Sequence, residues 1–142
     1  IMSLLFKNFK MVIISLIPNV IPLIIAGGIM GYFNIPLKPS SALVFSIVFG
    51  ISVDYSIHFL AKFKNELQTK SLEESIINTI NQTGRSMIFT SFILFFGFII
   101  FAFSDFGGTI VLGVLTSIIL FVAMITNLTL LPSIILHFYK KN

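Results

Sequence analysis

Four long apolar stretches make up most of this chain and leave few folds open to it. The first, residues 11–33, holds no charged residue. As an α-helix with a rise of about 1.5 Å per residue it would extend roughly 34 Å, enough to cross a hydrocarbon layer of about 30 Å. Only 10% of the residues are charged, whereas a soluble domain carries about 25%. The sequence therefore predicts an integral membrane protein.

We predict an all-α fold, a polytopic membrane helix bundle with four transmembrane helices, at about residues 11–33, 40–63, 86–104 and 109–136. Residues 34–41 contain two prolines, and residues 104–108 contain Asp105 and two glycines, so both segments have the composition of turns. Pro132 is expected to mark a bend in the last helix or its exit from the membrane.

A short amphipathic helix is predicted at about residues 71–83, between the second and third spans. Ser71 and Glu74 have the spacing of a capping box, and apolar residues then recur at helical intervals. Gly84 is suited to end this helix. We expect the helix to lie along the cytoplasmic face of the membrane.

The basic residues predict which ends of the spans face the cytoplasm. With four spans, all basic residues but Lys38 fall on one side: Lys7, Lys10, Lys62, Lys64, Lys70, Arg85, Lys140 and Lys141. Cytoplasmic loops are enriched in Lys and Arg. We therefore expect a multi-pass protein of the plasma or inner membrane with both termini in the cytoplasm. The same bias accounts for the net charge of +4 without a nucleic-acid partner.

Asp54 is the one acidic residue inside the apolar stretches. On a helix, Gly50, Asp54 and His58 share one face because residues four apart are stacked, and the loop positions place Asp54 near the middle of the membrane. A carboxylate there costs about 2.5–3.5 kcal/mol, and removal from water favours the neutral form of an acid. Asp54 is therefore a candidate for taking up and releasing a proton.

The neighbours of Asp54 suggest a relay. The imidazole of His58 changes charge near neutral pH and could pass protons toward the cytoplasm. Tyr55 could hydrogen-bond an acid on another helix, and Gly50 would leave room there for a helix or for water. In the alternative, Asp54 is neutral and only holds a neighbouring helix, a structural contribution of about 0.6–2 kcal/mol. Further polar residues that could line the same interior are Thr90, Ser91 and Asn127.

Several other kinds of function find no support in the sequence. There is no cysteine and there are only two histidines, which argues against a metal site. We find no phosphate-binding loop, hydrolase elbow or nucleophile–base set. We therefore expect neither enzyme activity nor a cofactor, and we expect the lipid bilayer to be the main partner of this surface.

A series of segments, in order, resembles the resistance-nodulation-division (RND) transporters, most closely their MMPL branch, which is related to sterol-sensing-domain proteins. These segments are residues 17–22 (IPNVIP), 28–31 (GIMG), 50–60 (GISVDYSIHFL), 83–91 (TGRSMIFTS), 96–98 (FGF), 103–104 (FS) and 130–132 (LLP). Residues 1–142 would then form part of a membrane domain, either helices three to six or helices nine to twelve of twelve. The first residue, Ile1, suggests a piece of a larger protein, and the end soon after the last span slightly favours the C-terminal half.

The resemblance implies a secondary transporter that uses the proton motive force to export hydrophobic or lipid-like substrates. It implies that Asp54 and Tyr55 face an equivalent Asp-Tyr pair in the other half. The partners would be the remaining helices and the extracytoplasmic domains of the full transporter, so this chain is not expected to transport alone. Alternatives within the same superfamily are a sterol-sensing-type lipid-binding regulatory module and a protein-export auxiliary. Residues 59–62 (FLAK) lack the Phe-Glu-Arg-like run of the auxiliary.

Overall fold

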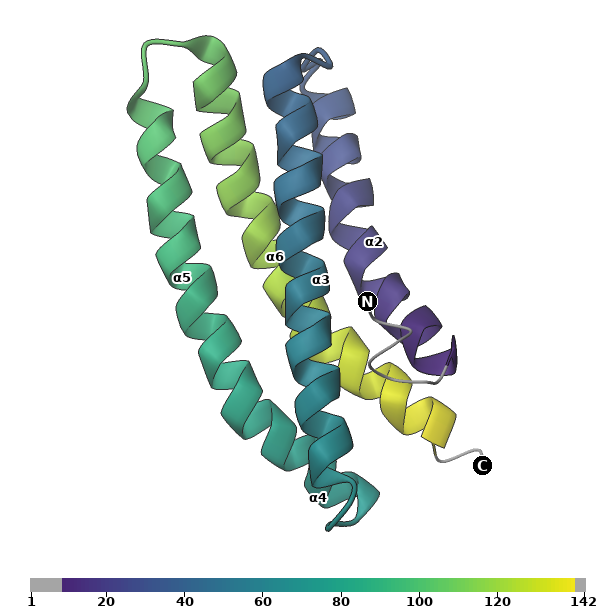
Figure 1. Ribbon diagram of the computed structural model, residues 1–142. Coiled ribbons are helices and arrows are strands. Elements are labelled where there is room, and N and C mark those ends of the chain that lie inside the picture. The colour runs from purple at the N-terminus through teal and green to yellow at the C-terminus, as the bar shows by residue number, and fades with distance from the viewer. Residues whose placement is uncertain (1–8, 140–142) are drawn as a thin grey trace.

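The computed structural model describes residues 9–139 as a chain of helices, with no strand in that part of the sequence. The elements are α2 (Phe9–Tyr32), α3 (Pro39–Glu66), α4 (Leu72–Thr79), the π-helix η1 (Ile80–Gly84), α5 (Arg85–Ile99), the 3₁₀-helix η2 (Ile100–Phe103) and α6 (Gly107–Tyr139). Four helical segments are long and apolar enough to cross a membrane: Ile13–Tyr32, Pro39–Glu66, Leu72–Phe103 and Gly107–Phe138. They run side by side (Figure 1), which confirms the predicted all-α bundle.

The third span differs from the prediction, because no break separates it from the short helix before it. The capping box is present: the Ser71 hydroxyl accepts from the Glu74 N–H at 3.4 Å, and the Glu74 carboxylate accepts from the Ser71 N–H at 3.4 Å. However, α4, η1, α5 and η2 follow one another as a continuous helix from Leu72 to Phe103. The prediction that a separate helix ends at Gly84 is therefore wrong.

The observed role of Gly84 is to let a neighbouring helix approach. Gly84 has ordinary right-handed helical angles and is buried. A Cβ atom at this position would lie 3.1 Å from Cδ2 of Leu128 on α6. The helix therefore continues through Gly84. A glycine is needed at this position because the close approach of Leu128 leaves little room for a side chain, and not because the backbone turns.

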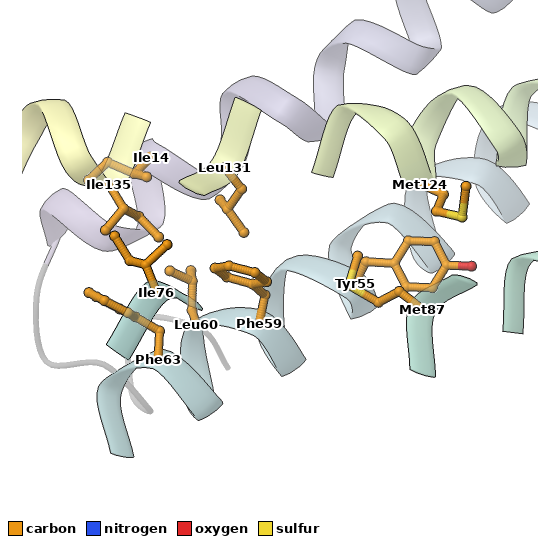
Figure 2. Close-up of a cluster of buried hydrophobic side chains, with 10 residues drawn as sticks. All are labelled: Ile14, Tyr55, Phe59, Leu60, Phe63, Ile76, Met87, Met124, Leu131 and Ile135. Carbon is orange, nitrogen blue, oxygen red and sulfur yellow. The ribbon is translucent and has the colours of Figure 1, made fainter. Parts of the chain in front are cut away.

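Helix α6 is the centre of the bundle. It packs against α2, α3 and α5, and α2 and α5 lie on opposite sides of it (Figure 1). It continues through Pro132 to Tyr139, so this proline does not end the helix. One buried apolar cluster joins α3, α4, α5 and α6 with Ile14 of α2, and Figure 2 shows its side chains, among them Phe59, Leu60 and Phe63 of α3. Helix α5, by contrast, exposes many large apolar side chains.

Candidate functional site

The site is built on α3, where Gly50, Asp54 and His58 share one face as the sequence predicts. The Nε2 atom of His58 lies 3.4 Å from Oδ1 of Asp54. Their side chains are 63% exposed for Asp54 and 69% exposed for His58 within this chain. A Cβ atom at Gly50 would meet nothing within 4 Å. The acid–imidazole pair therefore lies on a surface of a membrane-spanning helix that the described residues leave open.

Tyr55 points into the bundle and not toward this open face. Its side chain is buried, 3% exposed, and its hydroxyl lies 2.6 Å from the hydroxyl of Ser91 on α5. Figure 2 shows its ring at one end of the buried cluster, close to Met124 and Met87. Tyr55 and Ser91 thus join α3 to α5 beside Asp54.

A groove of about 610 Å³ separates α3 from the η1–α5 helix. Its lining residues are Asp54, Tyr55, His58, Ala61, Lys62, Asn65, Gln82, Thr83, Ser86, Met87 and Thr90. Most of these side chains are polar, so the groove offers several hydrogen-bonding groups beside Asp54. The predicted lining residue Thr90 does belong here, and its hydroxyl donates to the Ser86 carbonyl of its own helix at 2.9 Å.

The other two predicted lining residues lie elsewhere. Ser91 is buried against Tyr55, and Asn127 is fully buried behind α3. There, Asn127 belongs to a polar cluster with Asn19, Ser52 and Ser56, and we call these four residues the polar clamp. Three members were missed in the sequence. The available signal was an asparagine between two prolines and a pair of serines four residues apart.

From the groove, the series of ionisable side chains on α3 continues to the end of the helix. Lys62 lies one turn after His58 and pairs with Glu66 at 2.8 Å. Glu66 also pairs with Lys70 at 2.6 Å. Ionisable groups therefore follow one another every four residues from Asp54 to Lys70, which links the middle of the span to its charged end.

Residues 1–140 match the sequence model of the MMPL family. The chain belongs to the MMPL family. It is a multi-pass membrane protein, in keeping with its four apolar spans.

Two curated proteins are similar in sequence to this chain. The chain is 28% identical over 124 residues to a putative membrane protein of Methanocaldococcus jannaschii, which covers 87% of this chain and 32% of the relative. It is 29% identical over 102 residues to the mycolic acid-containing lipids exporter MmpL11 of Mycolicibacterium smegmatis, which covers 70% of this chain and 11% of the relative. The chain thus spans a third or less of the length of these two relatives. No solved structure gives a significant match.

Proposed function

We propose that this MMPL chain is part of a secondary transporter that uses the proton gradient to move hydrophobic or lipid-like substrates, with Asp54 as the group that binds and releases the proton. One observation carries the proposal. Asp54 and His58 lie together on the open face of a spanning helix whose opposite face is packed. Because a carboxylate facing lipid costs about 2.5–3.5 kcal/mol, this face calls for a polar partner or for water.

The residues around Asp54 have separate roles in this proposal. His58, in contact with Asp54, passes protons along the polar groove toward the basic end of α3. Tyr55 lies on the inner side of α3 and holds α3 to α5 through its bond to Ser91. It can face the Asp-Tyr pair of the other half only if that bond opens. The remaining helices of the full transporter cover the open face of α3, and its extracytoplasmic domains are further partners of this chain. Both chain termini lie in the cytoplasm.

The substrate class rests on likeness to a relative. MmpL11 of Mycolicibacterium smegmatis is described as an exporter of mycolic acid-containing lipids. We extend only the chemical class, long apolar molecules, to this protein. The exposed apolar side chains of α5 are compatible with contact to such molecules or to the bilayer.

A second candidate is a regulatory module of the sterol-sensing type, which binds lipid without pumping. The observation in its favour is a shallow apolar groove of about 340 Å³ on α2, lined by Ile13, Leu16, Ile17, Val20, Ile21 and Ile24. Lipid binding that is unchanged when the proton gradient is collapsed would favour this candidate over the transporter.

The decisive experiment replaces Asp54 by Asn in the full-length protein. Asn keeps the shape of the side chain but cannot exchange a proton, so gradient-driven export should be abolished while the protein still accumulates in the membrane. Asp105→Asn is the matched control, because Asp105 lies in the exposed turn between η2 and α6 and should leave export unchanged. If the Asp54→Asn variant exports at the wild-type rate and is expressed normally, Asp54 does not carry the proton.

A further inference from the structure

The polar clamp lies at the point where α2, α3 and α6 meet. The hydroxyl of Ser52 donates to Oδ1 of Asn19 at 2.8 Å. The hydroxyl of Ser56 lies 2.9 Å from the same oxygen and 2.7 Å from Oδ1 of Asn127. The amide of Asn127 closes the cluster by donating to Ser52 at 3.0 Å, and it also donates to the Ala123 carbonyl at 3.0 Å. All four clamp residues are fully buried or nearly so.

These contacts differ from the usual behaviour of small polar residues in membrane helices. Ser and Thr there commonly bond a carbonyl one turn earlier in their own helix. In this chain that arrangement is found at Ser75, Thr79, Thr90, Thr126, Thr129 and Ser133. Ser52 and Ser56 instead reach across to two other helices. Their hydroxyls therefore fix how α3 is oriented against its neighbours.

The two serines of the clamp lie close to Asp54 in the sequence but on the opposite side of α3. Ser52 and Ser56 lie two residues before and two residues after Asp54. At about 100° per residue, each is turned about 200° from Asp54, which is nearly the opposite side of the helix. When both serines are held inward by Asn19 and Asn127, Asp54 is necessarily directed outward, toward His58 and the groove.

We propose that the polar clamp sets the rotation of α3 and thereby holds Asp54 toward the groove, so that Asn19, Ser52, Ser56 and Asn127 are positioning residues for the proton site. The importance of this orientation for transport rests on the proposed function, but the orientation itself does not. Losing one buried hydrogen bond costs about 1 kcal/mol, which corresponds to about a fivefold change in the balance between two orientations of α3. Loss of the clamp should therefore alter the surroundings of Asp54 even in folded protein.

The test measures Asp54 without using transport. Dicyclohexylcarbodiimide, an apolar reagent that modifies protonated carboxyl groups, is applied to membranes that contain the full-length protein, and the labelled Asp54 peptide is quantified by mass spectrometry. The variant Ser52→Ala/Ser56→Ala removes both cross-helix hydroxyls with little change in volume. Ser46→Ala, at an exposed position of the same helix, is the matched control. We expect the labelling rate at Asp54 to change by at least about fivefold in the double variant, which loses more than one of these hydrogen bonds, and to remain unchanged in the control.

Each other result has a clear reading. If the double variant lowers thermal stability but labels at the parental rate, the clamp only packs the helices and the proposal is overturned. If the double variant does not accumulate, Ser52→Ala alone carries the same comparison, because Ser56 still bonds Asn19 and Asn127. If Asp54→Asn exports normally while labelling still responds to the clamp, the proton-transport proposal fails and the orientation proposal stands.

Discussion

Asp54 and Tyr55 are adjacent in the sequence and both line the groove, but they differ in burial. The Asp54 side chain is largely exposed, whereas Tyr55 is buried and bonded to Ser91. A buried hydroxyl that loses its partner keeps the cost of having left water, about 1–3 kcal/mol. The Tyr55–Ser91 pair is therefore a place where one substitution tests whether α5 is held to α3 by a polar bond or by packing alone.

We predict that Ser91→Ala destabilises the protein more than Tyr55→Phe does. Ser91→Ala leaves the phenol of Tyr55 buried without its partner, at a cost of about 1–3 kcal/mol. Tyr55→Phe leaves a serine that is able to bond its own helix, so its cost should be smaller. The thermal unfolding midpoint of the purified protein in detergent measures the difference.

Thr129→Val is the control for this comparison, since Thr129 is exposed and its hydroxyl bonds the Ile125 carbonyl of its own helix, at 2.7 Å. It should change the midpoint little. Equal midpoints for Ser91→Ala and the parent protein would show that the Tyr55 hydroxyl readily finds another partner.

At the scale of the helices, the continuous span from Leu72 to Phe103 meets α6 at two glycines. Gly84 faces Leu128 near one end of the contact. Gly113, on α6, would place a Cβ atom 2.6 Å from the Phe98 carbonyl oxygen and 2.6 Å from Cβ of Phe101. The second contact is stricter, because a backbone oxygen cannot move aside as the end of a leucine side chain can.

We predict different effects on stability for two Gly→Ala substitutions in this pair of helices. Gly113→Ala should destabilise the protein, because overpacking costs about 1–3 kcal/mol and exceeds the gain in helix propensity. Gly97→Ala, on α5, meets nothing within 4 Å and should be neutral or stabilising, by up to about 1 kcal/mol. Thermal unfolding in detergent compares the two, and a stable Gly113→Ala variant would mean that η2 shifts away from α6 without cost.

These glycines also show what the sequence could and could not predict. The shared face of Asp54 and His58 follows from helical spacing alone, so it was predictable. The continuity of the third span could not be predicted. A glycine after an amphipathic segment can end a helix or can let a neighbouring helix pack closely, and the sequence does not distinguish the two. The polar clamp could be read from the sequence only as separate polar positions, and not as one cluster. Its members are far apart in sequence, and only the packing of three helices brings Asn19 and Asn127 to the two serines.

For the whole molecule, the arrangement of the helices places most of the basic residues at one end of the bundle. The α3–α4 connection lies at one end of the bundle, and the α2–α3 loop and the α5–α6 turn lie at the other (Figure 1). Lys62, Lys64 and Lys70 belong to the end of α3 or to the connection after it, and Lys38 shares a pocket with Gly107 and Gly108 of the α5–α6 turn. Lys10 is in the first turn of α2, which starts at Phe9, whereas Lys7, Lys140 and Lys141 lie outside the described residues. This distribution supports the proposed orientation, with the basic end in the cytoplasm.

The orientation predicts the accessibility of two loops in intact cells. Because the sequence has no cysteine, single substitutions within it give unique labels, provided that any cysteines elsewhere in the full-length protein are removed. Leu37→Cys, in the exposed α2–α3 loop, should react with a membrane-impermeant maleimide added to whole cells. Gln68→Cys, in the exposed α3–α4 connection, should react only after the cells are permeabilised. The reverse pattern would place the basic end outside the cell. The groove beside His58 and Lys62 would then connect Asp54 to the exterior and not to the cytoplasm.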